Sequence, residues 1–278
     1  MFRSWFVVLC LGCSVVDDRL ESIGRVEESD LREISGIVAS PSEKERFWVH
    51  NDSGNPAEIS LIGRKGKVHR TVKAPFVNID WEDIAVDANG RLYLGDIGNN
   101  RAILPLRAIH RFAEPEGKKI EAVETCRYGF GTGMRFDCES LFVIGDFVHL
   151  ISKRLDGRPA VVYRLRFDPK ATLVEPAIPE RLGELERFVE PATGADLSRD
   201  GRRLAVCAES VTRIYEPDAS PSGWKLIGEI RYGARRIEAI AWDGDDLLLT
   251  DEPGRLFRIE KKEWSKPIPA VTSGQRLP

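Results

Sequence analysis

Acidic side chains recur at one position of a repeated segment, a pattern typical of a site built from several equivalent strands. Five segments share one pattern, in which one or two polar residues lie near the start of a short apolar strand. They read ISGIVAS (34–40), WEDIAVD (81–87), CESLFVI (138–144), GADLSRD (194–200) and EAIAWDG (238–244). The first supplies Ser35, and the other four supply the acids Glu82, Asp83, Glu139, Asp196 and Glu238, with Asp80 and Asp137 just upstream.

Carboxylates that converge repel one another unless a cation lies among them or some of them stay protonated. Sites made of oxygen ligands suit a hard cation such as Ca²⁺ better than zinc. We therefore expect the five aligned acids to be metal ligands and Ca²⁺ to be the cofactor. The alternative is a structural ring, in which these polar residues hydrogen-bond to neighbouring backbone and brace the strands.

A second set of polar residues follows the next strand of each repeat. The loops HNDSGN (50–55), GDIGNNR (95–101), SKRLDG (152–157) and TDEPG (250–254) mix acids with amides and bases. The predicted ligand-binding residues are His50, Asn51, Asp52, Asp96, Asn99, Asn100, Arg101, Lys153, Arg154, Asp251 and Glu252. Asp83, Glu139 and Lys153 are the candidates for catalysis. Tight turns use many of the same residue types, so an ordinary turn is the alternative for each loop.

Composition and motifs exclude several classes of function. The net charge is −3 and the basic residues are scattered, so we expect no nucleic-acid partner. If Cys10 and Cys13 belong to the N-terminal segment, Cys126, Cys138 and Cys207 remain; these are widely spaced and form no CxxC, which argues against a zinc site. Nucleophile-elbow, P-loop and dinucleotide-binding motifs are absent from the sequence. We expect a monomer.

The spacing of the repeats predicts the fold. The aligned residues Ile37, Ile84, Leu141, Leu197 and Ile240 are separated by 47, 57, 56 and 43 residues. Periods of about 45–55 residues are typical of four-stranded propeller blades. Second and third strands follow each segment, and outer strands are expected at 67–74, 119–130, 171–176 or just after it, and 224–233. The sequence therefore predicts an all-β, five-bladed β-propeller, with six blades as the alternative.

The fifth blade lacks an outer strand, and the segment SIGRVEES (22–29) can supply it. An open ring would expose unpaired strand edges, so we expect this N-terminal strand to close the propeller. Helix-like spacing occurs in one place, IPERLGELERFV (178–189).

The N-terminal segment has the outline of an export signal, with Arg3 before an apolar stretch that ends in small residues. LCLGCS resembles a bacterial lipobox, in which Cys13 would carry the lipid; a plain cleaved signal is the alternative. We predict a leader at 1–17, one propeller domain at 18–265 and a tail at 266–278. The protein is then extracytoplasmic, with membrane contact only through a lipid at Cys13.

HNDSGN, DWEDIA and GDIGNNR resemble segments of exported bacterial β-propeller proteins of largely unknown function. More distantly, the chain resembles the phytase-like, esterase-like-phytase and calcium-dependent propeller hydrolases. The resemblance implies that Glu82, Glu139 and Glu238 correspond to rim acids that hold calcium in those enzymes. The first blade departs from the pattern because it offers Ser35, and a complete phytase ligand set is absent.

Three functions follow from these observations. The first is a secreted or cell-envelope propeller that binds a small polar or anionic ligand, a glycan or a protein at the rim of its channel, with bound Ca²⁺. The second is a Ca²⁺-dependent hydrolase of phosphate esters or lactones, with Glu139 or Asp83 as base and Lys153 or Arg101 on the anion. The third is a glycan-active enzyme that uses two rim carboxylates.

Overall fold

The computed structural model describes residues 20, 22–27, 31–101, 103–130, 137–233 and 235–268. The predicted leader, including Cys13, and residues 269–278 of the predicted tail lie outside these ranges.

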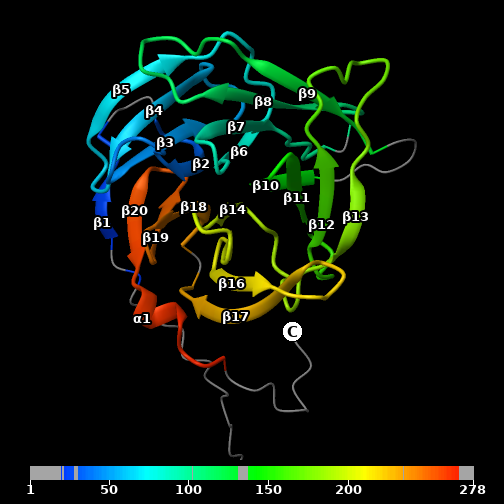
Figure 1. Ribbon diagram of the computed structural model, residues 1–278. Helices are drawn as coiled ribbons and strands as arrows, with labels where there is room; N and C mark the ends of the chain where they lie inside the picture. The colour runs from blue at the N-terminus through cyan, green and yellow to red at the C-terminus, as the bar shows by residue number, and fades with distance from the viewer. Residues whose placement is uncertain are drawn as a thin grey trace, which may run out of the picture.

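Five antiparallel four-stranded sheets are arranged as the blades of a ring (Figure 1). The first blade is β2 (Ile34–Ala39), β3 (Arg46–Asn51), β4 (Glu58–Gly63) and β5 (Val68–Lys73), and the second is β6 (Trp81–Val86), β7 (Arg91–Asp96), β8 (Arg107–Ala113) and β9 (Glu124–Tyr128). The third is β10 (Asp137–Ile144), β11 (Phe147–Lys153), β12 (Val161–Arg166) and β13 (Glu180–Glu184), and the fourth is β14 (Gly194–Leu197), β15 (Leu204–Ala208), β16 (Val211–Pro217) and β17 (Trp224–Arg231). The fifth is β18 (Ile237–Asp243), β19 (Asp246–Asp251), β20 (Arg255–Ile259) and the N-terminal β1 (Ser22–Arg25). The five-bladed prediction is confirmed, and the six-bladed alternative is wrong.

Strand β1 closes the ring as predicted, because it supplies the outer strand that the fifth blade lacks. It pairs antiparallel with β20, placing Ser22 opposite Phe257 and Arg25 opposite Arg255. The backbone N–H of Val26 donates to the carbonyl of Gly254 at 2.8 Å, and the Val26 side chain is buried. The edge of β20 is therefore covered by chain from the opposite end of the sequence (Figure 1).

The outer strand of the third blade lies later than 171–176, at β13. The helix-like spacing of 178–189 does not produce a helix there, because the edge of β12 needs a partner. Val161 pairs with Glu184 and Arg164 with Glu180, so sheet pairing overrides the local periodicity. Within the described residues the structure has one short helix, α1 (Lys261–Trp264), and no helix long and apolar enough to cross a membrane.

The hydrophobic core consists of five clusters, each between two adjacent blades. Trp48 and Leu61 of the first blade pack with Trp81 and Leu94 of the second, and the other four interfaces are built in the same way. Each blade therefore buries both of its faces, which explains why the central strands read as nearly continuous apolar runs. The ring is held by contacts between blades. The first strand of each blade is its inner strand: β2, β6, β10, β14 and β18. The mouth of the channel is the end of the ring at which these inner strands begin.

Removing β1 should destabilise the whole ring. A chain that begins at residue 31 loses the buried side chains Leu20 and Val26, and we expect a loss of about 3–6 kcal/mol of unfolding free energy. The exposed β20 edge should also promote aggregation. Thermal and urea unfolding compared with a chain that begins at residue 20 measures the effect; equal stability of the two chains would contradict the role of β1.

Candidate functional site

The inner strands of four blades each begin with a β-bulge, seen as a register shift in the pairing with the second strand. The shifts lie between Ile34 and Gly36, Trp81 and Asp83, Cys138 and Ser140, and Ile237 and Ala239. The residues left out of the ladder are Ser35, Glu82, Glu139 and Glu238. A bulge re-aims a side chain, and bulges are common beside active sites. In the fourth blade β14 pairs without a shift and has no such residue.

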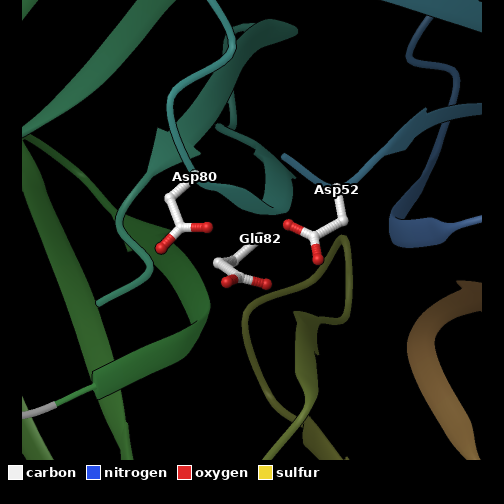
Figure 2. Close-up of side chains that lie close together, drawn as sticks. All are labelled: Asp52, Asp80 and Glu82. Carbon is white, nitrogen blue, oxygen red and sulfur yellow. The ribbon is translucent and has the colours of Figure 1, made fainter. Parts of the chain in front are cut away.

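Glu82 lies between two groups of carboxylates. The first triad is Asp52, Asp80 and Glu82, and the second triad is Glu82, Asp137 and Glu139. In each triad one carboxylate oxygen from every member lies within 4.8 Å of the others. Asp52 follows β3, Asp80 precedes β6, and Asp137 and Glu139 begin β10, so three blades contribute. Figure 2 shows the Asp52 and Asp80 side chains on either side of Glu82.

One oxygen of the shared carboxylate has no hydrogen-bond partner. The Ser35 hydroxyl lies 2.9 Å from the backbone carbonyl of Glu82 and 3.0 Å from its Oε2 atom. The other oxygen, Oε1, is buried and unpartnered, and Glu82 is 3% exposed. A buried charged oxygen without a partner is costly, so the site requires either a proton or a cation at this atom.

Burial and neighbouring acids make these carboxylates hard to ionise. Burial, with repulsion from Glu139 and Asp52, raises the pKa of Glu82 well above its usual range. The pKa values of Asp52 and Asp80 are raised, chiefly by burial. The pKa of Glu139 is raised to about 8 by burial, although Lys153 opposes the shift. A cation would remove this repulsion and favour the ionised forms.

Gly98 leaves room for the first triad. The backbone N–H groups of Ile97 and Gly98 donate to the carbonyl of Asp80, each at 3.1 Å. A Cβ atom at Gly98 would lie 2.3 Å from Glu82 Oε1 and 2.5 Å from Asp80 Oδ2. Any side chain at this position would therefore displace the carboxylates. In the sequence, the glycine of GDIGNN indicates that the backbone approaches another group closely at this point. The sequence does not show that this group is the carboxylate of Glu82 or Asp80.

Lys153 lies beside the second triad, at the end of β11. Its ammonium group hydrogen-bonds to Glu139, and its side chain is 22% exposed. Although burial opposes it, attraction to Glu139, Asp137 and Glu82 raises the pKa of Lys153. Glu238 lies outside both triads; burial raises its pKa to about 7, against the attraction of Lys153.

Asp83, which follows the displaced Glu82, and Asp196 of the fourth blade brace the ring. Asp83 Oδ2 accepts the backbone N–H of Leu141 at 2.8 Å and of Ala195 at 3.2 Å, and its Oδ1 accepts that of Ile84 at 2.9 Å. Asp196 Oδ2 accepts the backbone N–H of Trp242 at 2.7 Å. Neither residue belongs to a triad, so their contacts match the structural alternative drawn from the sequence.

Two predicted ligand-binding residues, Asp96 and Asn99, hydrogen-bond to members of the triads. Asp96 Oδ1 accepts the backbone N–H of Asp80 at 2.7 Å. The backbone N–H of Asn99 donates to Asp137 Oδ1 at 2.6 Å, while its side chain binds the backbone of Ile103 and Leu104. These residues position the acids of the site.

The other predicted ligand-binding residues are divided between the interior and the rim. His50 is fully buried, and burial lowers its pKa to about 4, so it is neutral; Asn51 beside it is also buried. Asp251 accepts the backbone N–H of Arg255 at 2.7 Å, as an ordinary turn aspartate does. The remaining predicted residues lie on exposed or partly exposed loops: Asn100, Arg101, Arg154, which pairs with Asp156, and Glu252.

The opposite end of the channel contains a cavity of about 330 Å³. It is lined by Val38, Val86, Val143, Trp242 and the turns that follow the inner strands. Of the predicted metal ligands, Asp196 alone borders it. The acidic mouth and this cavity therefore lie at opposite ends of the first strands of the blades.

No family model and no curated protein matches this chain. Among solved structures it is similar to the PQQ-bound form of an aldose sugar dehydrogenase from Streptomyces coelicolor, with a TM-score of 0.52 and 12% identity over 87% of this chain and 96% of that one. It also matches a functionally unknown protein from Desulfotomaculum acetoxidans DSM 771, with a TM-score of 0.43 and 15% identity over 86% of this chain and 72% of that one. The first likeness shows a shared fold, and neither match supports the phytase-like resemblance.

Replacing Asp83 should destabilise the ring. In Asp83→Ala the buried N–H groups of Leu141 and Ala195 lose their acceptor, and we expect a loss of about 2–5 kcal/mol of unfolding free energy. Asp83→Asn keeps one oxygen acceptor and should lose less. Urea unfolding measures both variants, with the exposed Asp146→Ala as control; a loss in Asp83→Ala no larger than in that control would contradict the bracing role.

Proposed function

We propose that this protein binds Ca²⁺ in the first triad and, through the cation, a small polar or anionic ligand at the rim of its channel. The observation that carries the proposal is the buried, unpartnered Oε1 atom of Glu82, which lies between other carboxylates. A cation at this place would satisfy that atom and relieve the repulsion at the same time.

The donor set favours calcium over zinc or copper. All three residues of the first triad offer carboxylate oxygens, whereas zinc and copper sites usually include imidazole or thiolate. Oxygens separated by no more than 4.8 Å are close enough to share an ion at Ca–O distances of about 2.3–2.6 Å. Calcium takes about six to eight oxygen ligands, so water or ligand oxygens would complete the shell on the side where Asp52 and Asp80 are partly exposed.

We also propose that the chain is exported and acts as a monomer. The leader predicted at 1–17 supports export. Extracellular calcium modules bind Ca²⁺ with dissociation constants of about 10⁻⁴–10⁻³ M. We expect the three carboxylates of the first triad to bind Ca²⁺ in this range. The exposed Asn100 and Arg101 beside the mouth would then be available to a polar ligand held by the ion.

Calcium should raise the melting temperature of the protein. We expect a rise of about 1–5 °C on going from EDTA to about 1 mM Ca²⁺, because a ligand that binds the native state stabilises it by mass action. The rise should be smaller with Mg²⁺ and should disappear in Glu82→Gln. Glu116→Gln, at an exposed glutamate between β8 and β9, is the matched control. No change at millimolar Ca²⁺ would overturn the proposal.

A second candidate function is a Ca²⁺-dependent hydrolase of phosphate esters or lactones. It is favoured by Glu139, whose pKa of about 8 allows proton transfer near neutral pH. Bound Ca²⁺ would supply a Lewis acid that polarises the scissile group. Glu139 would take a proton from water, and Lys153 would hold the anion. Asp83, the other predicted base, has both oxygens engaged with backbone N–H groups.

Activity on aryl phosphates and simple lactones should depend on both Ca²⁺ and Glu139. Loss of a general base lowers the rate by about 10²–10⁴-fold, so Glu139→Gln should fall by that factor while Glu116→Gln keeps the activity. Initial rates with Ca²⁺ and with EDTA measure this. An unchanged rate in Glu139→Gln would remove Glu139 from the mechanism, and the absence of any turnover would leave the binding function.

A further inference from the structure

We infer that the Lys153 ammonium group is a built-in cation of the second triad, so that the channel mouth takes up one exchangeable divalent cation and not two. This inference rests on the proposed function, because it concerns the same group of carboxylates. It names the residue that decides how many ions the mouth can hold.

The two triads are closely similar apart from Lys153. Both contain Glu82, and both place three carboxylate oxygens within 4.8 Å of one another. Lys153 hydrogen-bonds to Glu139 and is attracted to all three members of the second triad. Lys153 attracts Asp52 of the first triad, and Arg107 attracts Asp80, by charge alone. No cation is hydrogen-bonded to the first triad among the described residues, and Glu82 Oε1 has no partner.

The register of one hairpin places the lysine. In three blades the pair just before the bulge is the last of the ladder: Ile34 with Asn51, Trp81 with Asp96, and Ile237 with Asp251. In the third blade the corresponding pair is Cys138 with Ser152, and the ladder continues by one further pair, Asp137 with Lys153. This additional pair places a cation opposite an acid. The bulge that follows Cys138 then brings Glu139 to the same ammonium group.

A divalent ion in the second triad would have to displace this ammonium group. Two positive charges a few ångströms apart repel strongly in a partly buried site. The Lys153 side chain is largely buried, so moving the ammonium group to water would require the side chain to change its conformation. Unlike a bound ion, the ammonium group is covalently held and cannot be removed by a chelator. The first triad can therefore exchange a divalent cation, whereas the charge of the second triad is partly neutralised at all times by the Lys153 ammonium group.

Calcium stoichiometry tests this inference directly. Isothermal titration of the protein with CaCl₂ at a mildly alkaline pH should give one ion per chain. Lys153→Met, which keeps the length of the side chain and removes the charge, should give two ions, with the first bound about tenfold more tightly because the repulsion is gone. Lys153→Arg should still bind one. If the Met variant folds poorly by circular dichroism, Lys153→Gln carries the same expectation.

A double variant checks where the second ion binds. Lys153→Met combined with Asp137→Asn should return the stoichiometry to one, because Asp137 belongs to the second triad alone. One ion in both the wild type and Lys153→Met, with affinities within about twofold, would overturn the inference and leave the proposed function intact. Two ions in the wild type would do the same. No binding to either protein would overturn the proposed function and this inference together.

Discussion

The carboxylate of Asp83 joins three inner strands at the centre of the ring, and the channel depends on this contact. Its oxygens accept backbone N–H groups from its own strand, from β10 and from β14, which lies two blades away. A buried carboxylate is tolerated when several N–H donors surround it. Asp196 joins the fourth and fifth blades in the same manner. The inner ends of the strands are thereby held at fixed places, and the mouth above them inherits its geometry.

The acids of the channel are of two kinds, distinguished by the state of their oxygens. Asp83 and Asp196 are engaged with backbone N–H groups, which is what a structural residue requires. Glu82 is as deeply buried and keeps one oxygen without a partner. That arrangement lowers the stability of the fold unless a ligand compensates for it. A buried polar atom that lowers the stability of the fold is typical of functional sites, because an arrangement that favours ligand binding is often unfavourable for folding.

The ring could be predicted from the sequence because each blade repeats a local pattern. The spacing of Ile37, Ile84, Leu141, Leu197 and Ile240 indicated five blades, and the missing edge partner of the last blade indicated the closing strand. The outer strand of the third blade was placed only to 171–176 or just after it, because the spacing around 180–184 suits a helix and the pairing of that strand with β12 lies outside the local sequence. Local pattern determines most of these strands, and edge pairing determines that one.

The candidate site was predicted only in part. The alignment of blade starts drew attention to Glu82 and Glu139, which the structure places in the triads. It did not separate them from Asp83 and Asp196, because a bulge changes which residue faces the channel and leaves no mark in composition. Asp80 and Asp137 were noted only as upstream acids, and the part of Gly98 depends on a contact between loops of the folded chain.

The bulges also separate two tasks that the inner strands perform. The laddered residues hold the blades together, whereas the residue displaced from the ladder contributes to the mouth. A substitution at a displaced position therefore alters the lining of the mouth with little effect on pairing within the blade. Evolution can consequently change the mouth one blade at a time, and a serine, a glutamate or no side chain at all already occurs at these positions in this single chain. Such a scaffold accommodates new binding specificities by single steps, which helps to explain how one architecture can acquire unrelated ligands.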